Sequence, residues 1–170
     1  MLILIASLQF AQGADIASDR IALGIFEDGS LVNNTESLGI LWDSDGKGST
    51  PLGADFILAG KPYEVWSAQY TVGGIEQSVV SGGPELSGGA QLSFSEVTTN
   101  DTMTWLSAQS EVAGLELYFE WEIPWGKDFA WLTITALATS QVSDLWVARI
   151  VDSDQESNDY ETYDTINLAQ

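Results

Sequence analysis

Residues 115–137 read LELYFEWEIPWGKDFAWLTITAL, and this stretch decides the class of fold. Its first eight residues alternate strictly, with Leu115, Leu117, Phe119 and Trp121 on one face of an extended chain and mostly glutamates on the other. A period of two is typical of a β-strand with one buried face. The Pro and Gly at 124–126 break the strand, and the β-branched and aromatic residues of 129–137 predict a second one.

The same signals recur along the chain and predict an all-β protein. We expect further strands at 20–26, 37–42, 63–72, 75–80, 90–98, 102–112 and 145–151, separated by Gly, Asp and Pro turns. Residues 142–150 also fit one face of a helix, but we interpret them as a central strand because they are apolar on both faces. Short, evenly spaced strands favour an antiparallel β-sandwich, mutarotase-like or jelly-roll-like, with two sheets and few or no helices. The 170 residues suffice for one such domain, expected over 14–170.

The charge balance restricts the partners and the chemistry. Twenty-five acidic residues face five basic ones, which gives a formal charge of −20. Such a field repels nucleic-acid phosphates and anionic lipids, so neither is an expected partner. The chain has no Cys and no His, which excludes disulfides, thiolate metal sites and His-based catalytic triads.

The N-terminus indicates export. Residues 2–8 are an apolar run, and the small residues at 11–13 suit cleavage before Ala14, so 1–13 reads as a signal peptide or its remnant. The alternative is a first strand formed by the β-branched residues near Ile3 and Ile5. The polar Gln9 and Gln12 interrupt the run well short of the ~20 apolar residues that a membrane-spanning helix needs. We therefore expect a secreted or cell-surface protein without a membrane span.

Several phrases resemble exported bacterial surface proteins that often carry C-terminal sorting tails of the PEP or Myxococcus type. The matching segments are Leu38–Ile40, Gly53–Ser67, Trp146–Gln155 and Thr165–Asn167. The relatives have a D-P-D loop where this chain has Ser153 in place of the Pro. The resemblance implies a secreted β-sandwich domain without an assigned activity. Because the chain stops at Gln170 without a sorting tail, a fragment of a longer protein is also consistent with the pattern.

Two acidic segments are candidate cation sites. Residues 152–164 contain six carboxylates, and we expect Asp152, Asp154, Glu156 and Asp159 to bind Ca²⁺, which takes six to eight oxygen ligands. The spacing is not that of an EF-hand, and the alternative is a solvated acidic loop. The turn that contains Asp43 and Asp45 is a weaker candidate, because Asp and Gly also suit a plain turn.

The seven tryptophans suggest a second kind of site. An exposed indole can stack on a sugar ring, and we expect Trp125, in the turn beside Pro124, and Trp66 to serve this role. The alternative for any of the tryptophans is core packing, which favours large aromatic side chains. Arg149, in an apolar strand, is expected to make a structural ion pair or, alternatively, to bind a substrate carboxylate.

Together these observations predict a secreted, acidic, non-catalytic module of the cell surface or extracellular matrix, stabilised by calcium. Its expected partners are a polysaccharide or other surface proteins. One alternative is a carbohydrate-binding module that uses exposed tryptophans. Another is a glycosidase-type enzyme with two carboxylates in a cleft, and a third is a filament subunit whose sheet a neighbour's strand completes.

Overall fold

The computed structural model describes residues 13–31, 39–42, 65–81 and 90–150. These ranges form β-strands and turns without a helix, and so they contain no helix long and apolar enough to cross a membrane. The strands are β1 (Ala14–Ala17), β2 (Ile21–Ile25), β3 (Ile40–Trp42), β4 (Val65–Val72), β5 (Ile75–Val80), β6 (Ser93–Phe94), β7 (Thr98–Thr99), β8 (Met103–Val112), β9 (Leu115–Pro124), β10 (Trp131–Ala138) and β11 (Val142–Ile150). The all-β prediction is confirmed.

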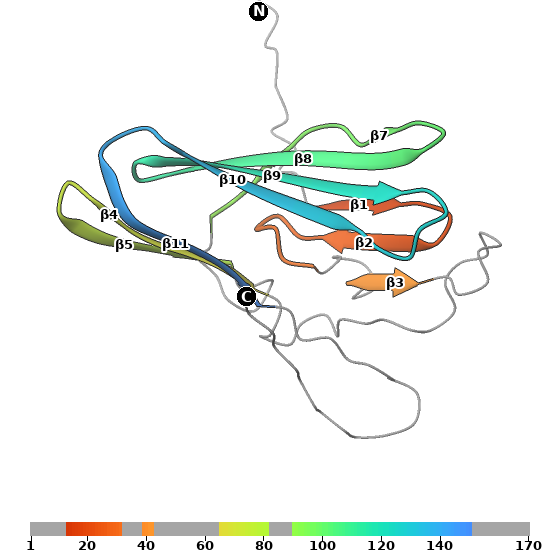
Figure 1. Ribbon diagram of the computed structural model, residues 1–170, viewed down its shortest axis with the longest axis horizontal. Helices are drawn as coiled ribbons and strands as arrows, with labels where there is room; N and C mark the ends of the chain where they lie inside the picture. The colour runs from red at the N-terminus through yellow and green to blue at the C-terminus, as the bar shows by residue number, and fades with distance from the viewer. Residues whose placement is uncertain (1–12, 32–38, 43–64, 82–89, 151–170) are drawn as a thin grey trace, which may run out of the picture.

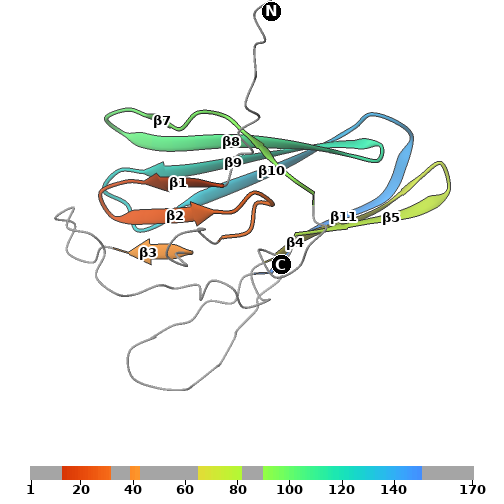
Figure 2. The same cartoon turned by 180° about the vertical axis from the view of Figure 1, so that it is seen from behind.

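The strands form three antiparallel sheets. The largest has the order β10-β9-β8-β6, with β7 also paired to β8, and the two smaller ones have the orders β1-β2-β3 and β11-β4-β5. Figure 1 shows β8, β9 and β10 side by side, while β4, β5 and β11 run together as a separate ribbon; Figure 2 gives the same arrangement from behind. The large sheet is one layer of the sandwich, and the two small sheets supply the residues that pack against it.

The alternation in the sequence explains the large sheet. All five odd-numbered residues from Leu115 to Ile123 are at most 1% exposed, and they point toward the core. In β8, Leu106 and Ala108 are buried in the same way. The tight β8–β9 turn requires Gly114, whose φ is +80° and where a Cβ would lie 2.6 Å from Ser140 Oγ.

The core joins the two layers through aromatic contacts. The ring of Trp66, from β4, lies 5.0 Å from that of Phe119 on β9, and Phe119 stacks on Trp121 at 5.7 Å. Ile16 and Ile25, from the β1-β2-β3 sheet, are 2% and 1% exposed in the same cluster. Burial of these apolar side chains is the main stabilising term of the fold.

The turn after β2 connects the layers. Trp66 Nε1 donates a hydrogen bond of 2.6 Å to the backbone oxygen of Asp28, and Leu92 N donates one of 2.7 Å to Glu27 O. Asp28 is 5% exposed, and its carboxylate accepts hydrogen bonds from both the backbone N–H and the Oγ of Ser30. Gly29 occupies the left-handed region at φ +83°, where a Cβ would meet Leu92 Cδ1 at 2.8 Å.

Most of the described strands match the sequence prediction, but β11 differs in one respect. It is a strand, as we interpreted it, but within the described ranges it pairs with β4 alone rather than lying at the centre of a sheet. Leu145, Trp146 and Val147 are 40%, 76% and 40% exposed. The apolar run therefore reflects a strand with exposed apolar side chains and not one covered on both faces.

Candidate functional site

Exposed aromatic side chains gather at one end of the large sheet. We call this group the aromatic end; it comprises Trp105 of β8, Trp131 of β10, and Trp125 and Phe129 of the connection between β9 and β10. Their exposed fractions are 36%, 57%, 41% and 44%. The rings of Phe129 and Trp131 lie 5.8 Å apart in a tilted contact. Concentrated apolar surface of this kind on a folded domain usually marks a binding site.

Strand register places two of these tryptophans in one row. Glu122 of β9 pairs with Trp105 on one side and with Trp131 on the other, and Thr98 of β7 pairs with Trp105. The neighbours of these residues along each strand point into the core, so the row lies on the outer face of the sheet. Because adjacent strands are about 4.8 Å apart, the two indoles are separated by roughly 10 Å, with the carboxylate of Glu122 between them.

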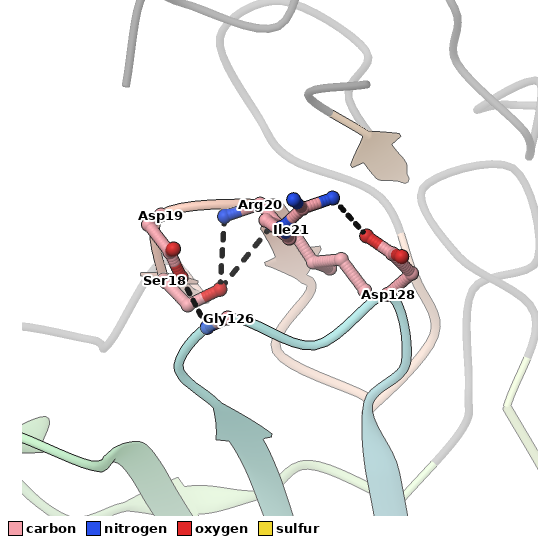
Figure 3. A network of polar contacts seen from close by, with 6 residues as sticks. All are labelled: Ser18, Asp19, Arg20, Ile21, Gly126 and Asp128. Atoms are coloured by element: carbon pink, nitrogen blue, oxygen red, sulfur yellow. Dashed lines mark hydrogen bonds and ion pairs between the residues drawn. The ribbon is translucent and has the colours of Figure 1, made fainter. Parts of the chain in front are cut away.

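The loop that carries Trp125 and Phe129 is attached to the β1–β2 turn. Gly126, at φ +69°, donates its backbone N–H to Asp19 Oδ1 at 2.7 Å. Arg20 Nη1 forms an ion pair of 2.9 Å with Asp128 Oδ1. Figure 3 shows both contacts, which cross from one turn to the other. The loop is therefore positioned by fixed polar contacts, so that less ordering is required when a ligand binds.

The β1–β2 turn is itself ordered by a serine cap. Ser18 Oγ accepts hydrogen bonds from the backbone N–H of Arg20 and of Ile21, at 3.2 and 3.3 Å. This bonding of a serine side chain to nearby backbone is a common way of closing a short turn. The cap directs Asp19 and Arg20 toward the β9–β10 loop, as Figure 3 shows.

A shallow hollow with a mixed polar and apolar lining lies beside the aromatic row on the same outer face. It has a volume of about 600 Å³, and its outer-face lining includes Ser107, Gln109, Tyr118, Glu120 and Thr135. These are hydroxyl, amide and carboxylate groups, which donate or accept hydrogen bonds without favouring an anion. An aromatic row next to a hollow with these polar groups matches the composition expected of a ligand site, in which apolar contact supplies area and polar groups set orientation.

One hydrogen bond within this polar surface perturbs a tyrosine. Tyr118 donates its hydroxyl to Glu116 Oε2 at 2.6 Å. This bond, together with desolvation and the negative charges of Glu116 and Glu111, raises the pKa of Tyr118 above its usual value of 10.0. The tyrosine therefore stays neutral well into the alkaline range.

The outer face of the large sheet is acidic. Strands β8, β9 and β10 carry Glu111, Glu116, Glu120 and Glu122, all on this face, and none of the three strands contains a Lys or an Arg. Such a surface repels anions and accepts hydrogen bonds from hydroxyl and ammonium groups. Glu120 and Glu122 lie on an open sheet face, whereas the glycosidase alternative requires a cleft.

The predicted site residues have different outcomes. Trp125 is exposed at the aromatic end, whereas Trp66 is 0% exposed and has its ring in the core, so its faces are not available to a ligand. Sequence reasoning did not single out Trp105 and Trp131, because only strand register brings them together.

The calcium predictions concern segments that the structure does not describe. Asp152, Asp154, Glu156 and Asp159 lie outside the described residues, as do Asp43 and Asp45. Within the described ranges, no group of three or more acidic residues is arranged to hold a metal ion. Calcium binding by the acidic loop stays a prediction.

Arg149 occupies a position on the inner side of β11. It pairs across the sheet with Trp66, and its Nη2 donates a hydrogen bond of 3.4 Å to Gly29 O. The side chain thus reaches the turn after β2, which connects the layers. The acceptor is a backbone oxygen, so the ion pair that the sequence suggested for Arg149 stays a prediction.

Comparison of the chain with protein-family models, with curated protein sequences and with solved structures returns no significant match. The geometry of the described residues is therefore the basis for a functional conclusion.

Proposed function

We propose that the chain is a secreted, non-catalytic module that binds a neutral polysaccharide at the aromatic end of its large sheet. The observation that carries the proposal is the outer-face row in which Trp105 and Trp131 flank Glu122. Two indoles on either side of Glu122, on one face of the sheet, offer a platform for successive sugar rings. The polar groups of the hollow beside them supply hydrogen bonds for the hydroxyls.

The physical basis is the two-sided chemistry of a sugar ring. A pyranose presents C–H groups on its faces and hydroxyl groups around its rim. Indole is large, rigid and apolar, and its electron-rich face attracts the polarised C–H groups. Glu120, Glu122 and Gln109 can then accept or exchange hydrogen bonds with the rim. Aromatic residues alone would suit many apolar partners, whereas aromatic residues among uncharged and acidic groups favour a polyhydroxylated one.

Charge decides which polysaccharide class fits. The chain carries −20 overall, and this charge includes the outer-face glutamates of β8 and β9, while β8, β9 and β10 contain no basic residue. A sulfated or uronic-acid polymer would be repelled by this field, especially at low salt. A neutral glycan experiences no such repulsion, and its hydroxyls find acceptors on the surface.

The test is binding to soluble neutral glycans by isothermal titration calorimetry, with hexasaccharides of glucan, xylan and mannan as probes. We expect wild type to bind at least one of them, and the Trp105→Ala/Trp131→Ala double variant to lose at least tenfold in affinity at the aromatic end. The matched control is Leu137→Ala, which removes an apolar side chain that is 53% exposed on the same face of β10 but at its other end. That variant should bind like wild type.

The alternatives predict other results. If the patch were a protein interface, wild type would bind none of the glycans at the aromatic end, and the Trp105→Ala/Trp131→Ala change would leave any glycan binding unaltered. If the module were a glycosidase, the probes would be cleaved, and Glu122→Gln would abolish cleavage while leaving binding intact. Either result would contradict the proposed function.

A further inference from the structure

Trp146 is the most exposed large apolar side chain among the described residues, and it lies far from the aromatic end. It belongs to β11, and 76% of its surface is accessible. Register pairs it with Gln69 of β4, whose neighbours Ala68 and Tyr70 are buried. Trp146 therefore stands on the outer face of the β11-β4-β5 sheet.

A β-bulge is responsible for this orientation. Val142 pairs with Val72 and Ser143 with Thr71, but the next pair is Trp146 with Gln69, so β11 has one extra residue here. Strict alternation from Val142, which packs against the core, would direct Trp146 inward. The extra residue reverses the alternation and turns the indole outward, which is a recognised use of bulges near binding sites. Asp144, at φ 54°, provides the required left-handed conformation, which Asp adopts more readily than most residues.

The exposed indole borders a hollow with a polar lining. The hollow has a volume of about 460 Å³, within the usual range for small-ligand pockets. Register places Thr71 opposite Glu76 and Gln69 opposite Ser78 on the outer face. Together with Asp144, these residues surround the hollow beside Trp146 with amide, hydroxyl and carboxylate groups and without a basic residue. This is the same chemistry as at the aromatic end, reached on a different sheet by different residues.

The two surfaces face away from each other. The inner faces of the large sheet and of β4 meet in one core, where Trp66 contacts Phe119 at 5.0 Å. Their outer faces must therefore point to opposite sides of the sandwich. Figures 1 and 2 show β4, β5 and β11 as a group apart from β8, β9 and β10. A short glycan cannot contact both surfaces at once, because the full thickness of the domain separates them.

We propose that the hollow at Trp146 is a second binding site for a neutral glycan, so that one molecule bridges two polysaccharide chains. The indole stacks on one sugar ring, and Gln69, Glu76 and Asp144 bond to the hydroxyls around it. The bridging role rests on the proposed function of the aromatic end, whereas the site at Trp146 stands on its own geometry. Because the sites face apart, they give no avidity on a short oligosaccharide, but they cross-link long polymers.

The experiment compares wild type, Trp146→Ala, the Trp105→Ala/Trp131→Ala variant and the combined triple variant. Calorimetry with the neutral hexasaccharides gives the number of binding sites, and light scattering with the parent polysaccharides gives cross-linking. We expect two sites in wild type, one in each partial variant and none in the triple variant. Cross-linking should be lost in all three variants, while Trp146→Ala still binds the polymer.

The control is Ile75→Ala, which removes an apolar side chain that is 66% exposed on β5, at a position that pairs with the inner-facing Val72. It should behave like wild type in both assays. Since Trp146 is mostly exposed, its removal should leave the melting temperature nearly unchanged. Gln69→Ala is a second variant that removes a polar group from the hollow while keeping the indole, and it should weaken the second site alone.

The outcomes separate the two proposals. If Trp146→Ala keeps both the site number and the cross-linking of wild type, the second site is wrong and the proposed function stands. If Trp146→Ala abolishes all binding while the Trp105→Ala/Trp131→Ala variant binds normally, the glycan site is at Trp146 alone, and both bridging and the proposed aromatic end are wrong. If wild type binds none of the glycans, both proposals fail.

Discussion

Replacing Trp66 and Trp121 separately by phenylalanine tests how the core holds the three sheets together. The two tryptophans form a matched pair, because they are 0% and 1% exposed and both contact Phe119. They differ in one hydrogen bond. Trp66 Nε1 donates to Asp28 O at 2.6 Å, whereas Trp121 Nε1 is buried and has no partner among the described residues.

The magnitude follows from this difference. Both changes remove the same atoms and leave a similar space, so the packing costs should largely cancel. Trp66→Phe also removes a buried hydrogen bond to the turn at Asp28, which costs about 1–3 kcal/mol when a buried group loses its partner. Trp121→Phe removes a buried donor that has no acceptor, which is neutral or favourable. We expect Trp66→Phe to be less stable than Trp121→Phe by about 1–3 kcal/mol.

Urea unfolding followed by circular dichroism measures the two free energies of unfolding, and equal m-values would show that the transitions are comparable. The Leu137→Ala variant, altered at an exposed position, should remain within about 0.5 kcal/mol of wild type. Equal stability of the two phenylalanine variants, or a lower stability for Trp121→Phe, would contradict this account. Trp66 would then not anchor the turn after β2 to the β11-β4-β5 sheet.

Further predictions concern single turns, the polar surface and the acidic loop. Gly114→Ala should destabilise the β8–β9 hairpin by about 1–3 kcal/mol in urea unfolding, because the residue has φ +80° and the added Cβ would meet Ser140 Oγ at 2.6 Å. The control is Gly73→Ala, where the added Cβ meets nothing within 4 Å. A smaller destabilisation for Gly114→Ala than for Gly73→Ala would contradict this prediction. Ultraviolet titration should show that Tyr118 ionises above its ordinary pKa of 10.0. Its signal is identified as the absorbance change that Tyr118→Phe removes, and this change should occur at lower pH in Glu116→Gln, because the hydrogen bond to Glu116 is lost. Because the folded pKa is the higher one, any stability linked to this group is present below pH 10 and is lost as the pH rises through the folded value, and a titration unchanged by Glu116→Gln would contradict the assignment. Asp128→Asn should cost no more than about 1 kcal/mol of stability, since the pair with Arg20 is partly exposed, yet it should weaken glycan binding by loosening the loop; unchanged affinity would show that the pair does not position the aromatic end. Calcium at 100 times its Kd should raise the melting temperature by about 5–10 °C over that in EDTA, with magnesium at matched ionic strength giving no such rise, if the acidic loop binds the ion as the sequence predicts.

The local pattern of the sequence was sufficient to predict the long strands of the large sheet and the face that each one buries. In β9, each residue's side is set by its own position in an extended chain, and the apolar residues at alternate positions determine which face is buried. The same applies to β10, where Leu132, Ile134 and Ala136 occupy alternate positions and pack against the core. The turn at Gly73 and Gly74 could also be predicted from the local sequence, because glycine readily adopts the positive φ that both residues have in the structure.

The candidate sites depend on contacts that no single segment contains. Trp105 and Trp131 are 26 positions apart, and only their shared pairing with Glu122 brings them into one row. Trp66 and Trp125 look alike as aromatic residues in the sequence, but one lies in the core and the other in a loop held by Asp19 and Arg20.

The exposure of Trp146 also depends on strand pairing and could not be predicted from its own segment. The apolar run around it suggested a covered strand, and the sequence reading weighed core packing for its indole. A bulge of one residue, defined only by pairing with β4, turns that indole to the surface. The all-β class, the acidic surface and the buried face of the main hairpin can be predicted from the amino-acid sequence, because they follow from alternation and composition. Which tryptophans are exposed and which lie together depends on the pairing of strands, because register and bulges are properties of paired strands and not of one segment.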